Sequence, residues 1–198
     1  MNEIPYIKIV DALVSDGHIV IENAFGEELS NSLLREAKKK DFRRAGISGA
    51  GDLHLDSSRR RDKIHWLDEE SLCEKSFNSF ATELKEQLNR ELYLGLTYYE
   101  LHFALYEEGD FYEKHLDSFA NFKNRVVTVV YYLNENFKED DGGELIIYDK
   151  DGEFLKKVTP RADTLVVFMS EKFPHEVLPA KRTRYSIAGW FRIDKFPL

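Results

Sequence analysis

RVVTVVYYLN, residues 125–134, is a run of β-branched and aromatic residues that ends at an asparagine. Residues of these types favour β-strands. From residue 96 onward similar short runs recur, separated by Gly, Asp, Asn and Pro, and each run predicts a strand. The predicted strands are 97–106, 111–115, 125–133, 144–148, 154–158, 164–169, 175–177 and 184–193. Eight strands at this spacing indicate a jelly roll, that is, a cupin-like double-stranded β-helix.

The first half of the chain has helical periodicity instead. Leucines, alanines and phenylalanines recur at three- and four-residue steps, which predicts helices over 8–14, 27–40 and 71–92, with a strand over 18–22 after the first helix. The lysines that end the second helix complement the negative end of its dipole. Cys73 falls on the apolar face of the third helix and is expected to be a core thiol.

Residues 46–62, GISGAGDLHLDSSRRRD, have almost no apolar period and predict a mobile loop. We therefore expect one mainly β domain with flanking helices, spanning residues 1–198. Residues 1–95 would form the helical support and a lid loop, with the helices packed on one sheet. Residues 96–193 would form the jelly-roll core.

Composition limits the classes of binding partner and the cellular compartment that we expect. A formal net charge of −8 and a pI near 5.3 argue against an extended surface for nucleic acid or anionic membrane. The single cysteine excludes an internal disulfide and favours a reducing compartment. The sequence shows neither a basic region followed by an apolar leader nor an apolar run of about 18 residues, so we expect a cytoplasmic protein.

The tripeptide His-Leu-Asp occurs twice, at 54–56 and at 115–117. On a strand, residues i and i+2 point to the same side, so each copy could offer an imidazole and a carboxylate to one metal ion. Only the second copy has partners, because His175 begins a later predicted strand and Arg184 follows on the next. Two histidines and one carboxylate leave open coordination positions, which is typical of non-heme Fe(II) oxygenases.

Arg184 could hold a planar carboxylate through two parallel hydrogen bonds, so a carboxylate co-substrate is expected. A zinc or manganese hydrolase could use the same three ligands, and a non-catalytic ligand sensor could keep the same shape. Neither alternative explains an arginine at this position. The remaining histidines are interpreted as ordinary structural or surface residues: His18, His54, His65 and His102.

Several longer motifs resemble one family. VVYYLN (129–134), GGELIIY (142–148), FPHEVLPA (173–180) and TRYSIAGWF (183–191) are similar to the core strands of the Fe(II)/2-oxoglutarate-dependent dioxygenases, and within them to the prolyl 4-hydroxylases of the hypoxia-inducible-factor (EGL-nine-like) type. RRRDKIHWL (59–67) resembles the loop that precedes the long helix in that group. The resemblance covers roughly residues 42–193.

The resemblance implies a role for each matching position. His115, Asp117 and His175 would bind Fe(II), and Arg184 and Tyr132 would bind the far carboxylate of 2-oxoglutarate. The remaining matches would line the co-substrate pocket or bind the substrate. Tyr106, Leu145 and Trp190 would line the pocket, and Arg125 and Arg61 would contact the substrate. The stretch from Tyr106 to His115 reads YEEGDFYEKH, one residue shorter than the family pattern and without its Pro-Gly.

The resemblance also implies a reaction. O2 and 2-oxoglutarate would be consumed, a substrate C–H bond hydroxylated, and succinate and CO2 released, with ascorbate as the reductant. We expect the substrate to be a prolyl residue, hydroxylated at C4, in a protein such as a translation factor or ribosomal protein. Hydroxylation of a free small molecule is the alternative.

Overall fold

The computed structural model describes residues 6–49, 52–54, 56–118 and 124–193. The helices are α1 (Tyr6–Ser15), α2 (Glu27–Ala37) and α3 (Leu72–Leu92). The first five strands are β1 (His18–Ile21), β2 (Arg43–Arg44), β3 (Ile47–Gly49), β4 (Asp52–His54) and β5 (Lys63–Trp66). The later strands are β6 (Tyr98–Tyr106), β7 (Tyr112–His115), β8 (Arg125–Tyr132), β9 (Leu145–Tyr148), β10 (Phe154–Val158), β11 (Leu165–Met169), β12 (His175–Val177) and β13 (Arg184–Arg192).

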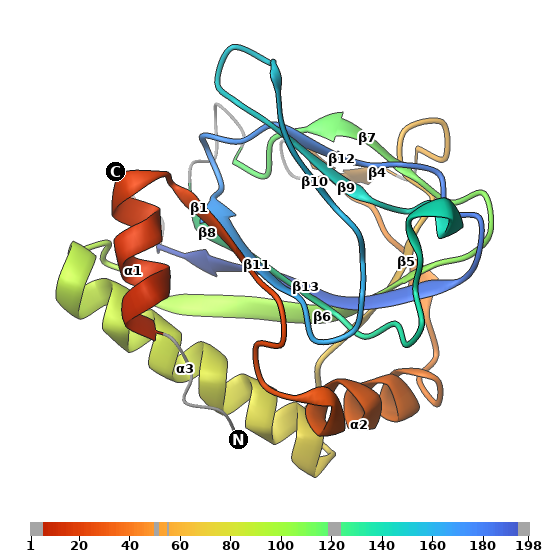
Figure 1. Ribbon diagram of the computed structural model, residues 1–198, viewed down its shortest axis with the longest axis horizontal. Coiled ribbons are helices and arrows are strands. Elements are labelled where there is room, and N and C mark those ends of the chain that lie inside the picture. The colour runs from red at the N-terminus through yellow and green to blue at the C-terminus, as the bar shows by residue number, and fades with distance from the viewer. Residues whose placement is uncertain (1–5, 50–51, 55, 119–123, 194–198) are drawn as a thin grey trace.

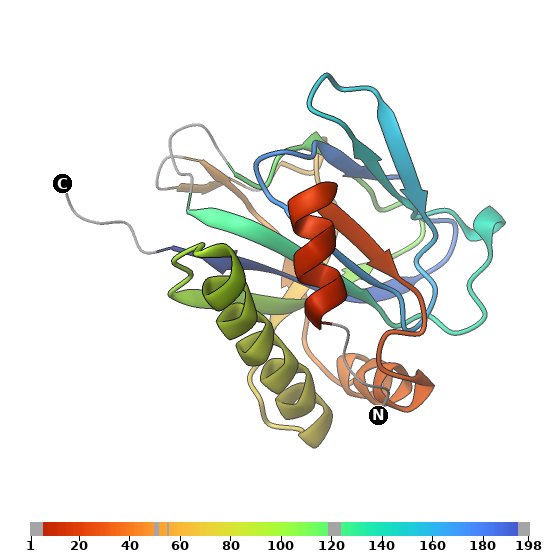
Figure 2. The same ribbon diagram turned by 60° about the vertical axis from the view of Figure 1, so that its left-hand side comes forward.

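Within the described residues the strands form two facing antiparallel sheets and a small hairpin. The larger sheet has the order β1-β11-β8-β13-β6-β5-β2, and the smaller has the order β10-β9-β12-β7. Figure 1 shows the helices together on one side of the larger sheet and the smaller sheet on its other side, and the turned view in Figure 2 agrees. The predicted jelly roll with helices on one sheet is therefore confirmed.

Alternation along the strands of the larger sheet separates two cores. In β8, Val127, Val129 and Tyr131 pack with the helices, whereas Val130 and Tyr132 face the smaller sheet. Successive side chains of a strand point to opposite faces, so each strand contributes to both layers. The helices therefore cover one face, and the other is left to line the space between the sheets.

The segment predicted as a mobile loop is partly ordered. Strands β3 and β4 pair as a hairpin, with Ile47 opposite His54, and the chain then enters β5, which lies between β6 and β2 in the larger sheet. The segments before and after the hairpin are joined, because the backbone N–H of Ala45 donates to the carbonyl of Asp62. The prediction of a mobile loop without strands over 46–62 was wrong for β3 and β4, because glycines and polar residues hide strand pairing that depends on backbone hydrogen bonds.

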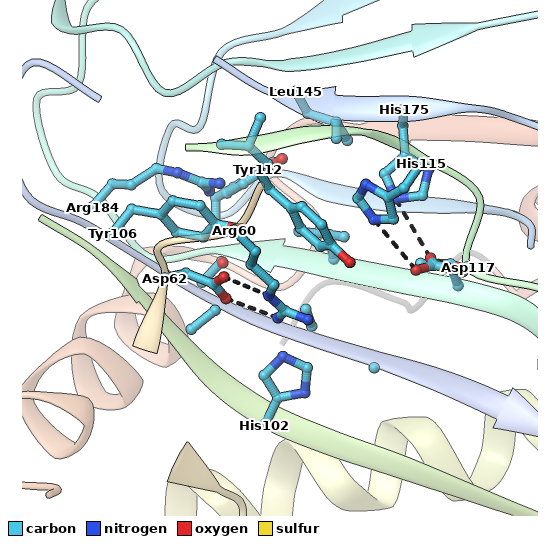
Figure 3. Close-up of a pocket in the computed structure, with 18 of the residues that line it drawn as sticks. Arg60, Asp62, His102, Tyr106, Tyr112, His115, Asp117, Leu145, His175 and Arg184 are labelled. Carbon is cyan, nitrogen blue, oxygen red and sulfur yellow. Dashed lines mark hydrogen bonds and ion pairs between the residues drawn. The ribbon is translucent and has the colours of Figure 1, made fainter. Parts of the chain in front are cut away.

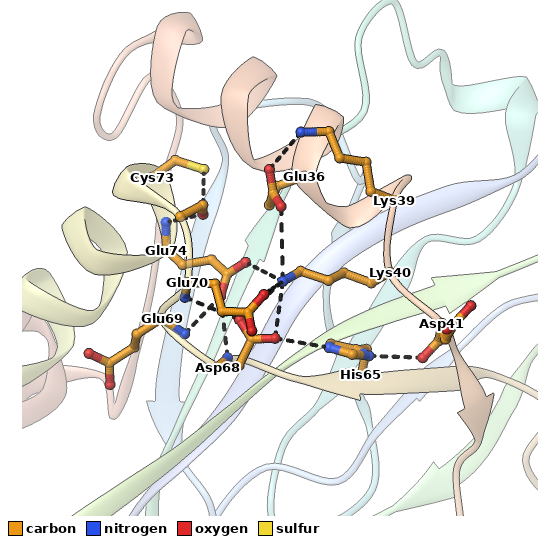
Figure 4. A network of polar contacts seen from close by, with 11 residues as sticks. Glu36, Lys39, Lys40, Asp41, His65, Asp68, Glu69, Glu70, Cys73 and Glu74 are labelled. Carbon is orange, nitrogen blue, oxygen red and sulfur yellow. Dashed lines mark hydrogen bonds and ion pairs between the residues drawn. The ribbon is translucent and has the colours of Figure 1, made fainter.

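The end of α2 also differs from expectation. The helix stops at Ala37, and Lys40 turns inward to a cluster of carboxylates (Figure 4). Its Nζ lies 3.0 Å from Asp68 and 3.1 Å from the fully buried Glu74 at the start of α3.

Cys73 is only partly buried, and its Sγ lies 3.2 Å from the hydroxyl of the capping residue Ser71.

Lys40→Met should lower the free energy of unfolding by roughly 3 kcal/mol, because it leaves the carboxylate of Glu74 buried without its counter-charge. Burial, followed by the neighbouring Asp68, already raises the pKa of Glu74. Urea unfolding measures the change. Lys39→Met is the control, since Lys39 is exposed and, among the described residues, its ion-pair partner is Glu36 at the helix surface, and it should cost less than about 1 kcal/mol. Equal effects of the two variants would contradict this role for Lys40.

No described helix combines the length and the apolar character that a membrane crossing requires.

Candidate active site

Two histidines and one aspartate meet between the sheets where β7 pairs with β12. His115 ends β7, Asp117 follows two residues later, and His175 begins β12 directly opposite His115. One potential ligand atom from each lies within 4.8 Å of the other two. The Nε2 atoms of His115 and His175 lie 3.7 and 3.5 Å from the carboxylate oxygens of Asp117 (Figure 3).

Backbone carbonyls orient both imidazole rings. Nδ1 of His115 lies 2.7 Å from the carbonyl oxygen of Glu113, and Nδ1 of His175 lies 3.0 Å from that of Phe173. A carbonyl only accepts, so each Nδ1 carries the proton and donates it. The Nε2 lone pairs of both rings are therefore free for a metal ion.

The pKa values of His175 and Asp117 also suit a bound cation. Burial lowers the pKa of His175 to about 4, with a further contribution from His115, so its ring is neutral at neutral pH. Burial alone would raise the pKa of Asp117, but His175 and His115 hold it well below its usual range. The hydroxyl of Thr128 donates to Oδ2 of Asp117 at 2.8 Å and fixes the carboxylate. Two imidazoles and one carboxylate fit a divalent metal with open positions.

A buried arginine lies at the other end of the same pocket. Arg184, on β13, is 2% exposed, and its Nε and one terminal nitrogen have no hydrogen-bond partner among the described residues. Its guanidinium carbon lies 4.2 Å from the ring centre of Tyr106 and 5.4 Å from that of Tyr132. A buried charge without a partner is costly, so this end of the pocket is suited to bind an anion.

The polypeptide makes room for that arginine. Gly143 passes so close that a Cβ atom there would lie 3.1 Å from Cδ of Arg184. Burial raises the pKa of Tyr132 to about 12, so its hydroxyl stays protonated beside the guanidinium. Tyr106 lies in this pocket although the chain is one residue shorter before His115 than the family pattern.

The pocket between these two ends is mostly apolar. Leu145 and Trp190, both predicted to line it, do so together with Ala104, Val130, Val177 and Ala188. Tyr112 stacks on His115 with ring centres 3.6 Å apart. Such walls exclude water from the space between the metal ligands and Arg184.

The two arginines predicted to contact substrate lie differently. Arg125 lies over the ring of Trp190 at 3.6 Å, and one of its terminal nitrogens approaches the carbonyl of Asp117 at 3.4 Å. Arg61 is exposed and contacts Phe111 and the carbonyl of Ser57. Neither Arg61 nor Arg125 is among the described residues that line the pocket. A role for Arg61 in binding substrate stays a prediction.

Sequence reasoning missed several residues of the pocket. Arg60 lies there instead of Arg61, paired with the buried Asp62 at 2.6 Å, and no local signal distinguishes it from its neighbours. His102, interpreted as an ordinary histidine, also lines the pocket. Strand alternation could have placed it, because His102, Ala104 and Tyr106 share one face of β6.

The first His-Leu-Asp copy falls at β4 and just beyond it. Leu55 and the side chain of His54 lie outside the described residues, and the ligand group found among the described residues contains only the second copy.

Comparison with known proteins gives a consistent result. Residues 101–192 match the model of the 2OG-Fe(II) oxygenase superfamily, where 2OG is 2-oxoglutarate. The chain is 32% identical to human "Prolyl hydroxylase EGLN3" over 203 residues, covering 92% of this chain and 81% of that protein. It is 29% identical to the "Hypoxia-inducible factor prolyl hydroxylase" of Caenorhabditis elegans, covering 94% of this chain but 28% of that longer protein.

Solved structures agree with the sequence comparison. A Pseudomonas putida prolyl-4-hydroxylase superposes with a TM-score of 0.87 at 34% identity, covering 96% of this chain and 100% of that one. A Trichoplax adhaerens prolyl hydroxylase, solved in complex with a hypoxia-inducible-factor oxygen degradation domain peptide, gives a TM-score of 0.82 at 30% identity over 94% and 88% of the two chains.

Proposed function

Because this chain belongs to the 2OG-Fe(II) oxygenase superfamily, and within it to the hypoxia-inducible-factor type of prolyl hydroxylases, we propose that it hydroxylates a prolyl residue of a protein at C4. The observation that carries the proposal is the similarity to prolyl hydroxylases over nearly the whole chain, with the metal ligands and the buried arginine in one pocket. Its family and fold are those of the 2-oxoglutarate-dependent dioxygenases, whose cofactors are Fe(II), 2-oxoglutarate and O2.

Each end of the pocket has a separate task. His115, Asp117 and His175 would hold Fe(II) through two Nε2 atoms and a carboxylate oxygen. When bound, Fe(II) with 2-oxoglutarate and O2 supplies the oxidising power, and the overall reaction yields succinate, CO2 and a hydroxylated substrate. Arg184 and Tyr132 would bind the far carboxylate of 2-oxoglutarate, and Tyr106 would form the wall beside it.

The apolar side chains between the two ends would protect the reaction from water. Leu145 contributes from the smaller sheet and Trp190 from the larger. Thr128 donates a hydrogen bond to Asp117 and would keep its carboxylate oriented toward the metal site. We propose that the 46–62 segment, including the β3–β4 hairpin, acts as a lid over this pocket.

For the polypeptide substrate, Arg125 would donate hydrogen bonds at the mouth of the pocket. Its guanidinium is mostly buried against Trp190 and has no carboxylate within ion-pair distance among the described residues. A substrate carbonyl would satisfy it. Arg61 would reach the same segment from the lid. A proline suits such a site because its fixed φ reduces the entropy lost on binding.

We also propose a cellular compartment, a partner and a reductant. The acidic chain with one free cysteine suits a cytoplasmic enzyme, a translation factor or ribosomal protein is the proposed partner, and ascorbate is the proposed reductant. These proposals concern the cellular setting and do not alter the chemistry of the pocket.

Incubation with a lysate of the host, Fe(II), 2-oxoglutarate and ascorbate should add about 16 Da, one oxygen atom, to specific prolyl residues detected by mass spectrometry. Arg125→Ala should lower prolyl hydroxylation at least about tenfold, because a buried donor to the substrate is lost. Arg90→Ala, on the exposed face of α3, is the matched control and should have no effect. Oxidation of free metabolites alone would contradict the proposed substrate.

A further inference from the structure

His102 is a buried histidine inside the pocket that the proposed chemistry does not use. It lies on β6, with Trp66 of β5 and Ala188 of β13 as its cross-strand neighbours, and it faces the same side as Ala104. Its side chain is 2% exposed. Figure 3 shows the ring below the Arg60 guanidinium, at the side of the pocket away from Arg184.

The ring is not satisfied by the protein. Nδ1 of His102 is buried and has no hydrogen-bond partner among the described residues. A buried polar atom without a partner is uncommon in folded proteins and costs free energy, and an apolar side chain would fill the same strand position without that cost. This side of the pocket is therefore built to receive a polar group that is absent from the protein itself.

The charge state of the ring restricts what it can bind. Burial, followed by the charges of Arg60 and Arg125, lowers the pKa of His102 to about 3. The ring is therefore neutral at neutral pH, with one donating and one accepting nitrogen. The neutral ring therefore adds no charge to that of the Arg60 and Arg125 guanidinium groups, and it interacts with a ligand through hydrogen bonds. A peptide amide, which is also neutral, matches it better than an anion does.

The neighbours of His102 match a polypeptide containing proline. The indole rings of Trp66 and Trp190 lie on either side of His102, with ring centres 5.2 Å and 5.4 Å from the centre of its ring. Trp66 is 50% exposed and Trp190 is buried, so the aromatic surface leads from solvent to the pocket. Aromatic surfaces bind proline-containing segments in several recognition domains, with polar groups fixing the register.

We propose that His102 is a specificity-determining residue that hydrogen-bonds a backbone amide of the substrate next to its target proline, in a subsite formed with Trp66 and Trp190. This inference rests on the proposed prolyl hydroxylation of a polypeptide. Fe(II) and 2-oxoglutarate bind through other residues, so His102 affects only the polypeptide.

The chain provides its own reporter for this subsite. It contains two tryptophans, and both contact His102, so intrinsic fluorescence reports occupancy of the subsite. The protein loaded with Fe(II) and 2-oxoglutarate without O2 would be titrated with capped pentapeptides that have proline at the centre and varied flanking residues. His102→Leu should weaken binding at least about tenfold, and His102→Gln, which keeps donor and acceptor atoms, should bind within about threefold of the wild type.

A second peptide series locates the hydrogen bond. Replacing one amide at a time by an ester removes the N–H and weakens the neighbouring carbonyl as an acceptor. At one linkage the ester should weaken binding to the wild type but not to His102→Leu, because the partner is already missing. His18→Leu, on β1 and separated from β6 by three strands of the same sheet, is the matched control and should bind every peptide like the wild type.

The outcomes separate this inference from the proposed function. Equal peptide affinity of the wild type and a folded His102→Leu overturns the role of His102 and leaves prolyl hydroxylation in place. A loss of 2-oxoglutarate affinity equal to the loss of peptide affinity, or ester effects that persist in His102→Leu, also overturns it by assigning the residue a structural role. A wild type that binds none of the peptides and hydroxylates no protein contradicts both.

Discussion

His115→Ala is expected to lower the affinity for Fe(II) at least about 100-fold and to abolish succinate formation. Loss of a partner that merely orients a metal ligand already costs 10–100-fold, and here one of three protein ligands is removed. Asp117→Ala should be at least as severe, because it also removes the charge that balances the cation. Fe(II) binding under anaerobic conditions and 2-oxoglutarate turnover measure the two effects.

The matched control is the other copy of the same tripeptide. His54→Ala changes an identical His-Leu-Asp sequence, but that copy falls at β4 of the hairpin and just beyond it, and the ligand group found among the described residues contains the second copy. It should leave Fe(II) affinity within about twofold of the wild type, since it removes none of the ligands. An equal loss of Fe(II) in both variants would show that the metal lies elsewhere.

Arg184→Lys should weaken 2-oxoglutarate binding by about tenfold or more, with Fe(II) affinity little changed. Lysine keeps the positive charge but not the planar fork that makes two parallel hydrogen bonds to a carboxylate. The space is also specific for arginine, because Gly143, Tyr106 and Tyr132 surround the guanidinium. Isothermal titration with 2-oxoglutarate and Mn(II), without O2, measures binding apart from turnover.

Arg182→Lys provides the comparison, because Arg182 is a neighbouring arginine that is partly exposed and paired with Asp141 at 3.2 Å. It should leave 2-oxoglutarate affinity unchanged. If Arg184→Lys binds 2-oxoglutarate like the wild type while Arg182→Lys does not, the carboxylate anchor is Arg182 and the assignment of Arg184 is wrong.

Much of the β half could be predicted from the sequence, because runs of Val, Ile, Tyr and Phe between turn residues mark strands directly. The predicted run 125–133 corresponds to β8, and 184–193 corresponds to β13, within a residue or two. The hairpin at 47–54 could not be predicted in this way. Its strands are three residues each and their pairing is set by backbone hydrogen bonds, so side-chain periodicity carries no signal there.

The site residues also fall into those that the sequence identifies and those that only strand pairing brings together. His115, Asp117, His175 and Arg184 are recognisable because their residue types and spacing suit one metal and one carboxylate, and the structure brings them into one pocket. The position of His102 depends on sheet register, which places β5, β6 and β13 side by side and brings Trp66 and Trp190 next to it. Neither neighbour is close to it in sequence.

The most direct test is one sample followed before and after exposure to air. Anaerobic addition of Fe(II) and 2-oxoglutarate should give a weak visible charge-transfer band, since both bind in one pocket. Admission of O2 should then convert 2-oxoglutarate to succinate, faster when a prolyl peptide substrate is present. A protein that binds zinc in preference, shows no band and forms no succinate would contradict the account and favour a hydrolase or a non-catalytic sensor with the same three ligands.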